Sequence, residues 1–233
     1  HKVKYLKELR IDQFINIKFN KLFSNFTAEN FIKKILNESL NIKHVFVGRD
    51  FHFGKNRAGN LDTLLNTGKH HNIGVTPIEL KSFDGKIISS TAIRECLSNG
   101  NIQKVNKSLG RPYIITGIVV EGDKRGRQIN FPTANIELGN LLRPAFGVYA
   151  VTVNSDILDN APGVANIGRR PTVNDRGELI EVHLFDRELD LYGKELYIAL
   201  RFFLREEKKF ESFDLLKNQI KKDAKKARFK LNL

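Results

Sequence analysis

The sequence has one cysteine, no methionine, no tryptophan and no long apolar run. The lone thiol, Cys96, excludes an internal disulfide and a cysteine-based metal cluster, which fits a reducing cytoplasm. No stretch approaches the ~18–20 apolar residues that a membrane-spanning helix needs, so we expect no membrane partner. The chain starts at His1, and because it contains no methionine we expect that further residues precede it.

The charge is strongly unbalanced. The 233 residues include 39 Lys and Arg against 26 Asp and Glu, which gives a net charge of +13. Such an excess favours a polyanionic partner: nucleic acid, an acidic surface or the phosphates of a nucleotide. A basic nucleic-acid-binding protein is the weaker alternative, because the lysine-rich stretch 217–228 lacks the interleaved aromatic residues of single-strand binders.

One stretch, 122–135 (GDKRGRQINFPTAN), has the composition of a phosphate-binding loop. Glycines let the backbone approach a ligand closely, and successive N–H groups in such turns suit phosphate oxygens. Pro132 stiffens the chain, so that Thr133 and Asn135 point to the same side of an emerging strand. Their hydroxyl and amide oxygens suit Mg²⁺ on a phosphate. The alternative is a solvated basic loop, because no Walker-type sequence is present.

The first half of the chain alternates strand and helix patterns. Apolar stretches predict strands at 14–19, 45–47 and 73–80, and helical spacing of apolar residues predicts helices at 31–40 and 61–65. This alternation favours an open, mostly parallel α/β sheet. Ligands of such sheets bind beyond the carboxyl ends of the strands.

Two polar stretches follow strands in this half. GRDFHFG, at 48–54, comes directly after a strand, and ISSTAIR, at 88–94, leads from a strand into a helix. The N-terminus of that helix suits an anion, with an arginine within one turn. Simple capping of the helix by Ser and Thr hydroxyls is the alternative.

The second half has the pattern of an all-β domain. Six short strands separated by turn residues predict a small closed barrel of Greek-key-like type, followed by a C-terminal helix capped by Ser212. The strands are expected at 113–120, 135–138, 147–154, 163–167, 180–185 and 194–204. We therefore divide the chain into two domains, 1–108 and 109–233.

Glu181 is the candidate acid of the second domain. It shares one face of its strand with His183, opposite an apolar face. If Thr133 and Asn135 lie across a cleft from it, the carboxylate can accept the proton of an alcohol that attacks phosphorus. An exposed strand glutamate and a purely structural histidine are the alternatives.

The second half resembles riboflavin kinase domains. Seven motifs occur in the order of that family between Leu109 and Arg228: LGRPY, GRQINFPTANI, GVYAV, GVANIGRRPTV, EVHLFD, DLYG and LREEKKF. One departure is Asn130, where the family usually has Gly, and Asn is the residue that otherwise best tolerates positive φ. The resemblance implies phosphorylation of riboflavin to FMN by ATP with Mg²⁺, with small molecules as partners.

The resemblance also implies roles for single residues. Thr133 and Asn135 would ligate Mg²⁺ together with the ATP phosphates, and Glu181 would be the general base on the terminal ribityl hydroxyl. From the residues alone, Arg201 and Arg205 either contact flavin or phosphate or solvate the barrel. The residues that would bind ATP are Gly122, Gly126, Arg127 and Thr133.

The first half, through GRDFHFG and ISSTAIR, resembles the FMN adenylyltransferase part of the bifunctional riboflavin kinase/FAD synthetase family. The resemblance implies a nucleotidyltransferase-like, Rossmann-like fold. The Gly-Phe-Asp turn and the His-x-Gly-His motif of the family do not occur in this sequence, so we expect an incomplete domain, and FAD synthesis to need residues absent from it. The implied nucleotide contacts are Asp50, Ser89, Ser90, Thr91 and Arg94.

Overall fold

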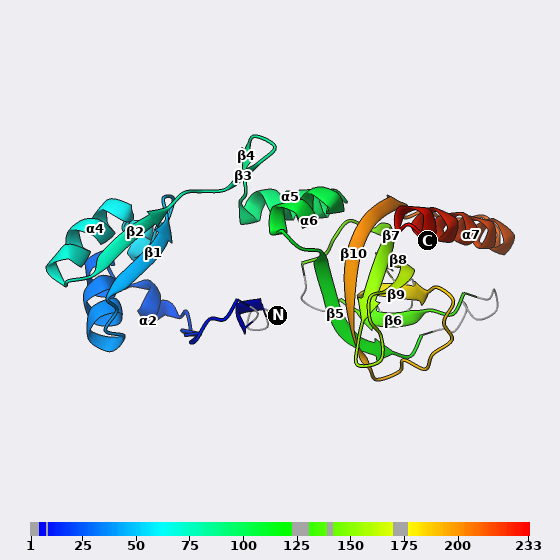
Figure 1. Ribbon diagram of the computed structural model, residues 1–233, viewed down its shortest axis with the longest axis horizontal. Helices are drawn as coiled ribbons and strands as arrows, with labels where there is room; N and C mark the ends of the chain where they lie inside the picture. Colours follow the sequence, from blue (N-terminus) through cyan, green and yellow to red (C-terminus); the bar gives the residue numbers. More distant parts are fainter. Residues whose placement is uncertain (1–4, 8, 123–130, 139–141, 170–176) are drawn as a thin grey trace. The chain divides into compact units, whose positions relative to one another are not determined.

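The computed structural model describes residues 5–7, 9–122, 131–138, 142–169 and 177–233 (Figure 1). Contacts between Cα atoms divide the chain into two compact units, His1–Lys81 and Ser82–Leu233. Among the described residues, no helix is both long and apolar enough to cross a membrane.

The first unit contains a small parallel sheet. Strand β1 (His44–Gly48) pairs with β2 (Gly74–Ile78), and helix α4 (Leu61–His70) lies between them in the sequence. The remaining elements are α2 (Lys21–Ser24), α3 (Ala28–Asn30), the π-helix η1 (Phe31–Ser39) and the 3-10 turn η2 (Lys55–Arg57). Their small core is formed by Ala28, Ile32, Phe53, Leu64 and Ile73.

The prediction of a strand at 14–19 is wrong. Residues 13–20 have no regular secondary structure, although their composition favours a strand. Phe14, Ile15 and Phe19 are 48%, 52% and 76% exposed. Strand propensity mainly reflects packing on a sheet, and within the described part of the chain this segment is not paired with any strand.

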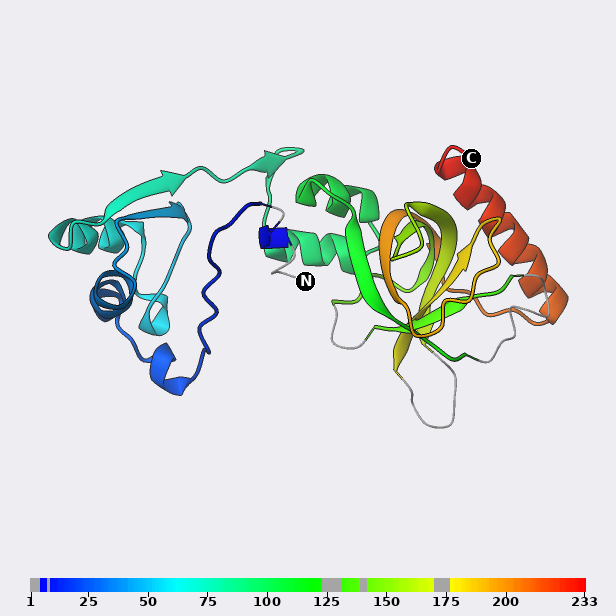
Figure 2. The same cartoon turned by 60° about the horizontal axis from the view of Figure 1, so that its bottom comes forward.

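The second unit is built on a closed six-stranded antiparallel barrel, which confirms the predicted architecture. The order of the strands around the barrel is β10-β5-β6-β9-β8-β7, so that β6 lies beside β9 although long connections separate them in the sequence (Figures 1 and 2). The strands are β5 (Tyr113–Val120), β6 (Ala134–Glu137), β7 (Gly147–Asn154), β8 (Ala161–Arg169), β9 (Glu178–Leu184) and β10 (Glu195–Glu206).

Alternating apolar side chains fill the inside of the barrel. Ile115, Ile136, Ile180 and Ile198, from four different strands, are at most 1% exposed. The long strand β10 pairs with β5 along its first half and with β7 from Tyr197 to Glu206, and its pairing with β7 shifts register twice. Such irregularities increase the bend of a strand, which helps a sheet to close on itself.

Helix α7 (Phe213–Lys230) covers part of the outer face of the barrel, as Figure 2 shows. Ser212 caps it by accepting a hydrogen bond from the Leu215 N–H at 3.3 Å, as predicted. Its Ala224 and Ala227 pack against Val148 and Val164, together with other apolar side chains of the outer face.

Two helices from the end of the predicted first domain pack on the barrel, and the second of them lies where the sequence suggested only a short connector. They are α5 (Ser90–Ser98) and α6 (Ile102–Leu109), and they follow the short hairpin of β3 (Ser82–Phe83) and β4 (Lys86–Ile87). Leu97 and Val105 belong to the barrel core, and Asn106 donates to the Leu200 carbonyl at 2.8 Å. The compact unit therefore begins at Ser82, and the domain boundary after residue 108 stays a prediction.

Candidate functional site

Asn135 and Glu181 lie side by side on the outer face of the barrel. The antiparallel pairing of β6 with β9 sets Asn135 directly opposite Glu181, and the flanking pair Ile136 and Ile180 points inward with 0% exposure. Side chains directly opposite each other on one face have Cβ atoms about 4.5–5.5 Å apart. The pairing thus brings an amide and a carboxylate together from positions 46 residues apart in the sequence.

Gly122 leaves room for the Asn135 side chain. A Cβ atom at residue 122 would lie only 2.1 Å from Asn135 Nδ2 and 2.6 Å from Cγ. The amide group of Asn135 therefore lies directly against the backbone of Gly122, where the candidate phosphate-binding loop begins. The rest of this loop at 123–130, including Gly126 and Arg127, lies outside the described residues.

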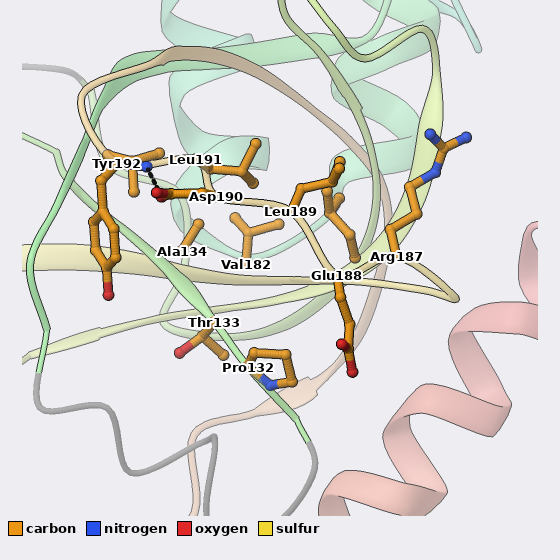
Figure 3. Close-up of a pocket in the computed structure, with 12 residues that line it drawn as sticks. Pro132, Thr133, Ala134, Val182, Arg187, Glu188, Leu189, Asp190, Leu191 and Tyr192 are labelled. Atoms are coloured by element: carbon orange, nitrogen blue, oxygen red, sulfur yellow. Dashed lines mark hydrogen bonds between the residues drawn. The ribbon is translucent and has the colours of Figure 1, made fainter.

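Thr133 lies at a cavity of about 730 Å³ (Figure 3). Apolar side chains of the barrel core, among them Val119, Ala134 and Val182, form part of its lining. The segment 187–192 lines it from another side, as Figure 3 shows. Within that segment the Tyr192 N–H donates to Asp190 Oδ1 at 3.1 Å, which stabilises the turn.

The predicted kinase residues thus form one connected region. Thr133 lines the cavity, Asn135 follows two residues later on β6, and Glu181 lies opposite Asn135. Neither Asn135 nor Glu181 belongs to the lining of the cavity. The region therefore joins a cavity with an apolar floor and several polar lining residues to a polar outer surface, with Thr133 between them.

The oxygen donors of this region fit Mg²⁺. The Thr133 hydroxyl and the Asn135 amide oxygen are hard ligands, and Gly122 gives the amide side chain the space that it occupies. In the described ranges no group of three His, Cys, Asp or Glu side chains could hold a metal ion. Mg²⁺ does not need such a group, because it commonly keeps several waters and binds through few protein ligands and substrate phosphates.

His183 is tied to the segment that carries Thr133. Its Nδ1 lies 2.9 Å from the Pro132 carbonyl oxygen, and its ring lies 4.8 Å from the ring of Phe131. Burial lowers the pKa of His183, the hydrogen bond to Pro132 and the Asp186 carboxylate oppose this shift, and the Arg228 guanidinium adds to it. The sequence indicated only that His183 shares a strand face with Glu181.

Arg201 and Arg205 both have partners within the barrel unit. Arg201 donates to Thr152 Oγ1 at 2.9 Å and to Asn160 Oδ1 at 3.2 Å. Arg205 forms an ion pair at 2.8 Å with Asp223 of α7, a side chain that is only 6% exposed. Neither arginine lines the cavity. Their contact with flavin or phosphate stays a prediction. The hydrogen bonds of Arg201 and the ion pair of Arg205 give each guanidinium a structural role.

The residues predicted for the first half lie in two different compact units. In the first unit, Asp50 follows β1, and a Cβ atom at Gly48 would lie 2.9 Å from its Oδ1. In the second unit, Ser89 is the N-cap of α5 and accepts a hydrogen bond from the Ala92 N–H at 3.1 Å. Ser90, Thr91 and Arg94 lie on the first turns of the same helix.

Two family models match the chain. The riboflavin kinase model matches residues 109–231, and the FAD synthetase model matches residues 1–92. The barrel with its helix and the region around Glu181 therefore belong to a riboflavin kinase domain, and a nucleotidyltransferase-like part precedes it. The class is that of flavin-nucleotide-forming transferases.

Relatives that match nearly the whole chain identify the family within this class. The chain is 41% identical to a bifunctional riboflavin kinase/FMN adenylyltransferase of Escherichia coli (strain K12), over 97% of the chain and 72% of the relative. It is 42% identical to the protein with the same description from Haemophilus influenzae, over 97% of the chain and 74% of the relative. The chain belongs to the bifunctional riboflavin kinase/FMN adenylyltransferase family.

A solved structure supports the fold over the same length. A crystal structure from Streptococcus pneumoniae, described as a macrolide-efflux protein, matches 97% of this chain and 73% of its own chain. The TM-score is 0.87 and the sequence identity is 30%. None of these comparisons supports the alternative of a basic nucleic-acid-binding protein.

Proposed function

We propose that this chain phosphorylates riboflavin to FMN with Mg²⁺ and ATP, using Thr133, Asn135 and Glu181. Membership in the family supplies the reaction. The observation that carries the assignment of residues is the direct pairing of Asn135 with Glu181 on one face of the barrel. ATP is the phosphate donor, riboflavin the substrate and FMN the product.

Glu181 acts as the general base. As the terminal ribityl oxygen of riboflavin forms a bond to the γ-phosphorus of ATP, its hydroxyl proton passes to the Glu181 carboxylate. The bond between the γ-phosphorus and the bridging oxygen breaks, and ADP leaves with that oxygen. Phosphoryl transfer needs mainly positioning and charge neutralisation from a protein, so one acid in the right place suffices.

Thr133 and Asn135 hold the phosphate end of the nucleotide. Their oxygens would ligate Mg²⁺, which when bound neutralises charge on the phosphates. Gly122 lets the backbone come close to the same phosphates, because it carries no side chain beside Asn135.

The cavity beside Thr133 takes the base of the nucleotide. Its volume of about 730 Å³ is typical of a small-molecule site, and Val119, Ala134 and Val182 give it an apolar floor. The flat aromatic ring of a nucleotide base fits such a floor, and the Thr133 hydroxyl, which also lines the cavity, would contact the phosphates. The loop at 187–192 would close over the ring.

Substitution of Glu181 tests its assignment as the general base. The variant Glu181→Gln keeps the size of the side chain but removes the proton acceptor, so kcat for FMN formation should fall by about 10²-fold or more. The matched control is Glu137→Gln, which makes the same change at an exposed position of neighbouring β6. If Glu181→Gln folds normally and keeps near wild-type turnover, Glu181 is not the base.

The second activity is adenylyl transfer to FMN, which is supported by the FAD synthetase match over residues 1–92. We infer that Ser89, Ser90, Thr91 and Arg94, which all lie at the start of α5, contact the nucleotide in adenylyl transfer to FMN. The support is the capped N-terminus of α5, which favours an anion, and the exposed Arg94 close to it. The assay is FAD formation from FMN and Mg·ATP by a protein that also contains the His-x-Gly-His motif, which this sequence lacks.

Arg94→Gln should lower FAD formation and leave FMN formation unchanged. The control is Lys69→Gln, which removes an exposed positive charge near the end of α4. Equal FAD formation by Arg94→Gln and Lys69→Gln would remove Arg94 from the site.

A further inference from the structure

His183 makes a contact that no strand pairing accounts for. The backbone pairing of β6 with β9 runs from Glu137 and Leu179 to Ala134 and Val182. One residue beyond this ladder, the His183 ring reaches the carbonyl oxygen of Pro132 with Nδ1 at 2.9 Å. A carbonyl oxygen only accepts hydrogen bonds, so Nδ1 carries the hydrogen.

This contact lies next to Thr133 in the chain. Pro132 has no N–H group and cannot donate to a neighbouring strand, so its carbonyl is the group through which the segment can be held. The His183 ring lies 4.8 Å from the ring of Phe131, which precedes the proline. One side chain thus contacts both residues that come before Thr133.

The ring of His183 also contacts Phe185, which in turn contacts helix α7. It lies 6.0 Å from the ring of Phe185, and the guanidinium of Arg228 on α7 lies 4.4 Å from that same ring. Arg228 also pairs with Asp186 at 2.7 Å. Helix α7, Phe185 and His183 therefore form a continuous series of contacts that ends at Pro132.

We propose that His183 is a positioning residue that sets the direction of the Thr133 hydroxyl by holding the Pro132 carbonyl. The inference rests on the proposed function in so far as Thr133 binds the nucleotide. The Nδ1 hydrogen of His183 is used in the bond to Pro132, so this nitrogen acts on the position of the backbone and not on the substrate. The expected loss on removing this bond appears in the affinity for Mg·ADP as well as in turnover.

Two variants of equal size separate the hydrogen bond from the ring. His183→Asn keeps an N–H donor near the position of Nδ1, whereas His183→Leu has almost the same shape without a donor. Isothermal titration should show Mg·ADP bound about tenfold more weakly by His183→Leu and within about threefold of wild type by His183→Asn. His70→Leu, at an exposed position of α4, is the control and should bind like wild type.

The tautomer gives a readout that needs no ligand. In ¹H–¹⁵N spectra of the full chain, the histidine signal that disappears in His183→Asn should show the hydrogen on Nδ1. A hydrogen on Nε2, or equal loss of Mg·ADP affinity in the Asn and Leu variants, would overturn the role of His183. If the wild-type chain forms no FMN, the proposed function is wrong. The tautomer spectrum and the Mg·ADP titration still test the role of His183 in that case.

Discussion

Replacing Gly122 by alanine tests how closely the start of the nucleotide loop and Asn135 are packed. The added methyl group would lie 2.1 Å from Asn135 Nδ2 and 3.0 Å from Oδ1. To reach an ordinary contact of 3.4 Å, the amide group must move by about 1.3 Å. Gly122 does not have positive φ, so the backbone accepts alanine and the change acts on the side chain of Asn135.

The expected effect is on catalysis rather than on folding. A displacement of about 1 Å of a positioning group can cost roughly 10²-fold in rate. We expect Gly122→Ala to lower kcat for FMN formation by about 10- to 100-fold, with an unfolding midpoint close to that of wild type. Initial rates of FMN formation at saturating Mg·ATP and riboflavin measure this loss.

A double-mutant cycle identifies the cause. In an Asn135→Ala background the side chain that the methyl group displaces is gone, so Gly122→Ala should have little further effect. If Gly122→Ala lowers kcat equally in both backgrounds, or keeps kcat within twofold of wild type, the packing of residue 122 against Asn135 does not explain the need for glycine.

Three further predictions concern stability. The pKa of His183 in the folded chain lies below the ordinary value of 6.5, so at lower pH the unfolded chain binds more protons than the folded chain. The contribution of His183 to stability should therefore be complete above pH 6.5 and decrease as the pH falls. Urea unfolding at several pH values should show a smaller decrease in His183→Asn. Arg205→Met leaves the buried Asp223 carboxylate without its cationic partner, although Gln219 still donates to it, and should cost about 3 kcal/mol in urea unfolding; a loss below about 1 kcal/mol would contradict the pairing. Tyr149→Phe removes the bond to the Ala145 carbonyl at 2.6 Å and should cost about 1 kcal/mol by the same method; an unchanged midpoint would contradict it.

The barrel could be predicted from the composition and periodicity of its strands. The bounds of β5 and β7 are those expected from the sequence, and β9 and β10 differ by one or two residues at their ends. In β9 the buried apolar face alternates with a face that carries Glu181 and His183, and this period of two fixes the register. Both faces of β7 are buried, so its apolar, β-branched composition and the flanking turn residues mark the strand instead. The alternation in β9 put Glu181 on the outer face.

Other features depend on tertiary contacts that a pattern does not contain. The segment 14–19 is apolar, yet it is not a strand, because strand formation needs a partner. The packing of α5 and α6 on the barrel core could not be predicted, because the apolar face of a helix does not show which core it joins. The bond from His183 to Pro132 spans 51 residues, and only the folded barrel brings the two together.

The measurement that tests the central claim most directly is a crystal structure of the chain with Mg²⁺, ADP and riboflavin. We predict the metal ion on the Thr133 hydroxyl and the Asn135 amide oxygen, and the terminal ribityl hydroxyl about 2.6–3.2 Å from the Glu181 carboxylate. A nucleotide bound away from Thr133, or a ribityl chain that does not reach Glu181, would contradict the assignment.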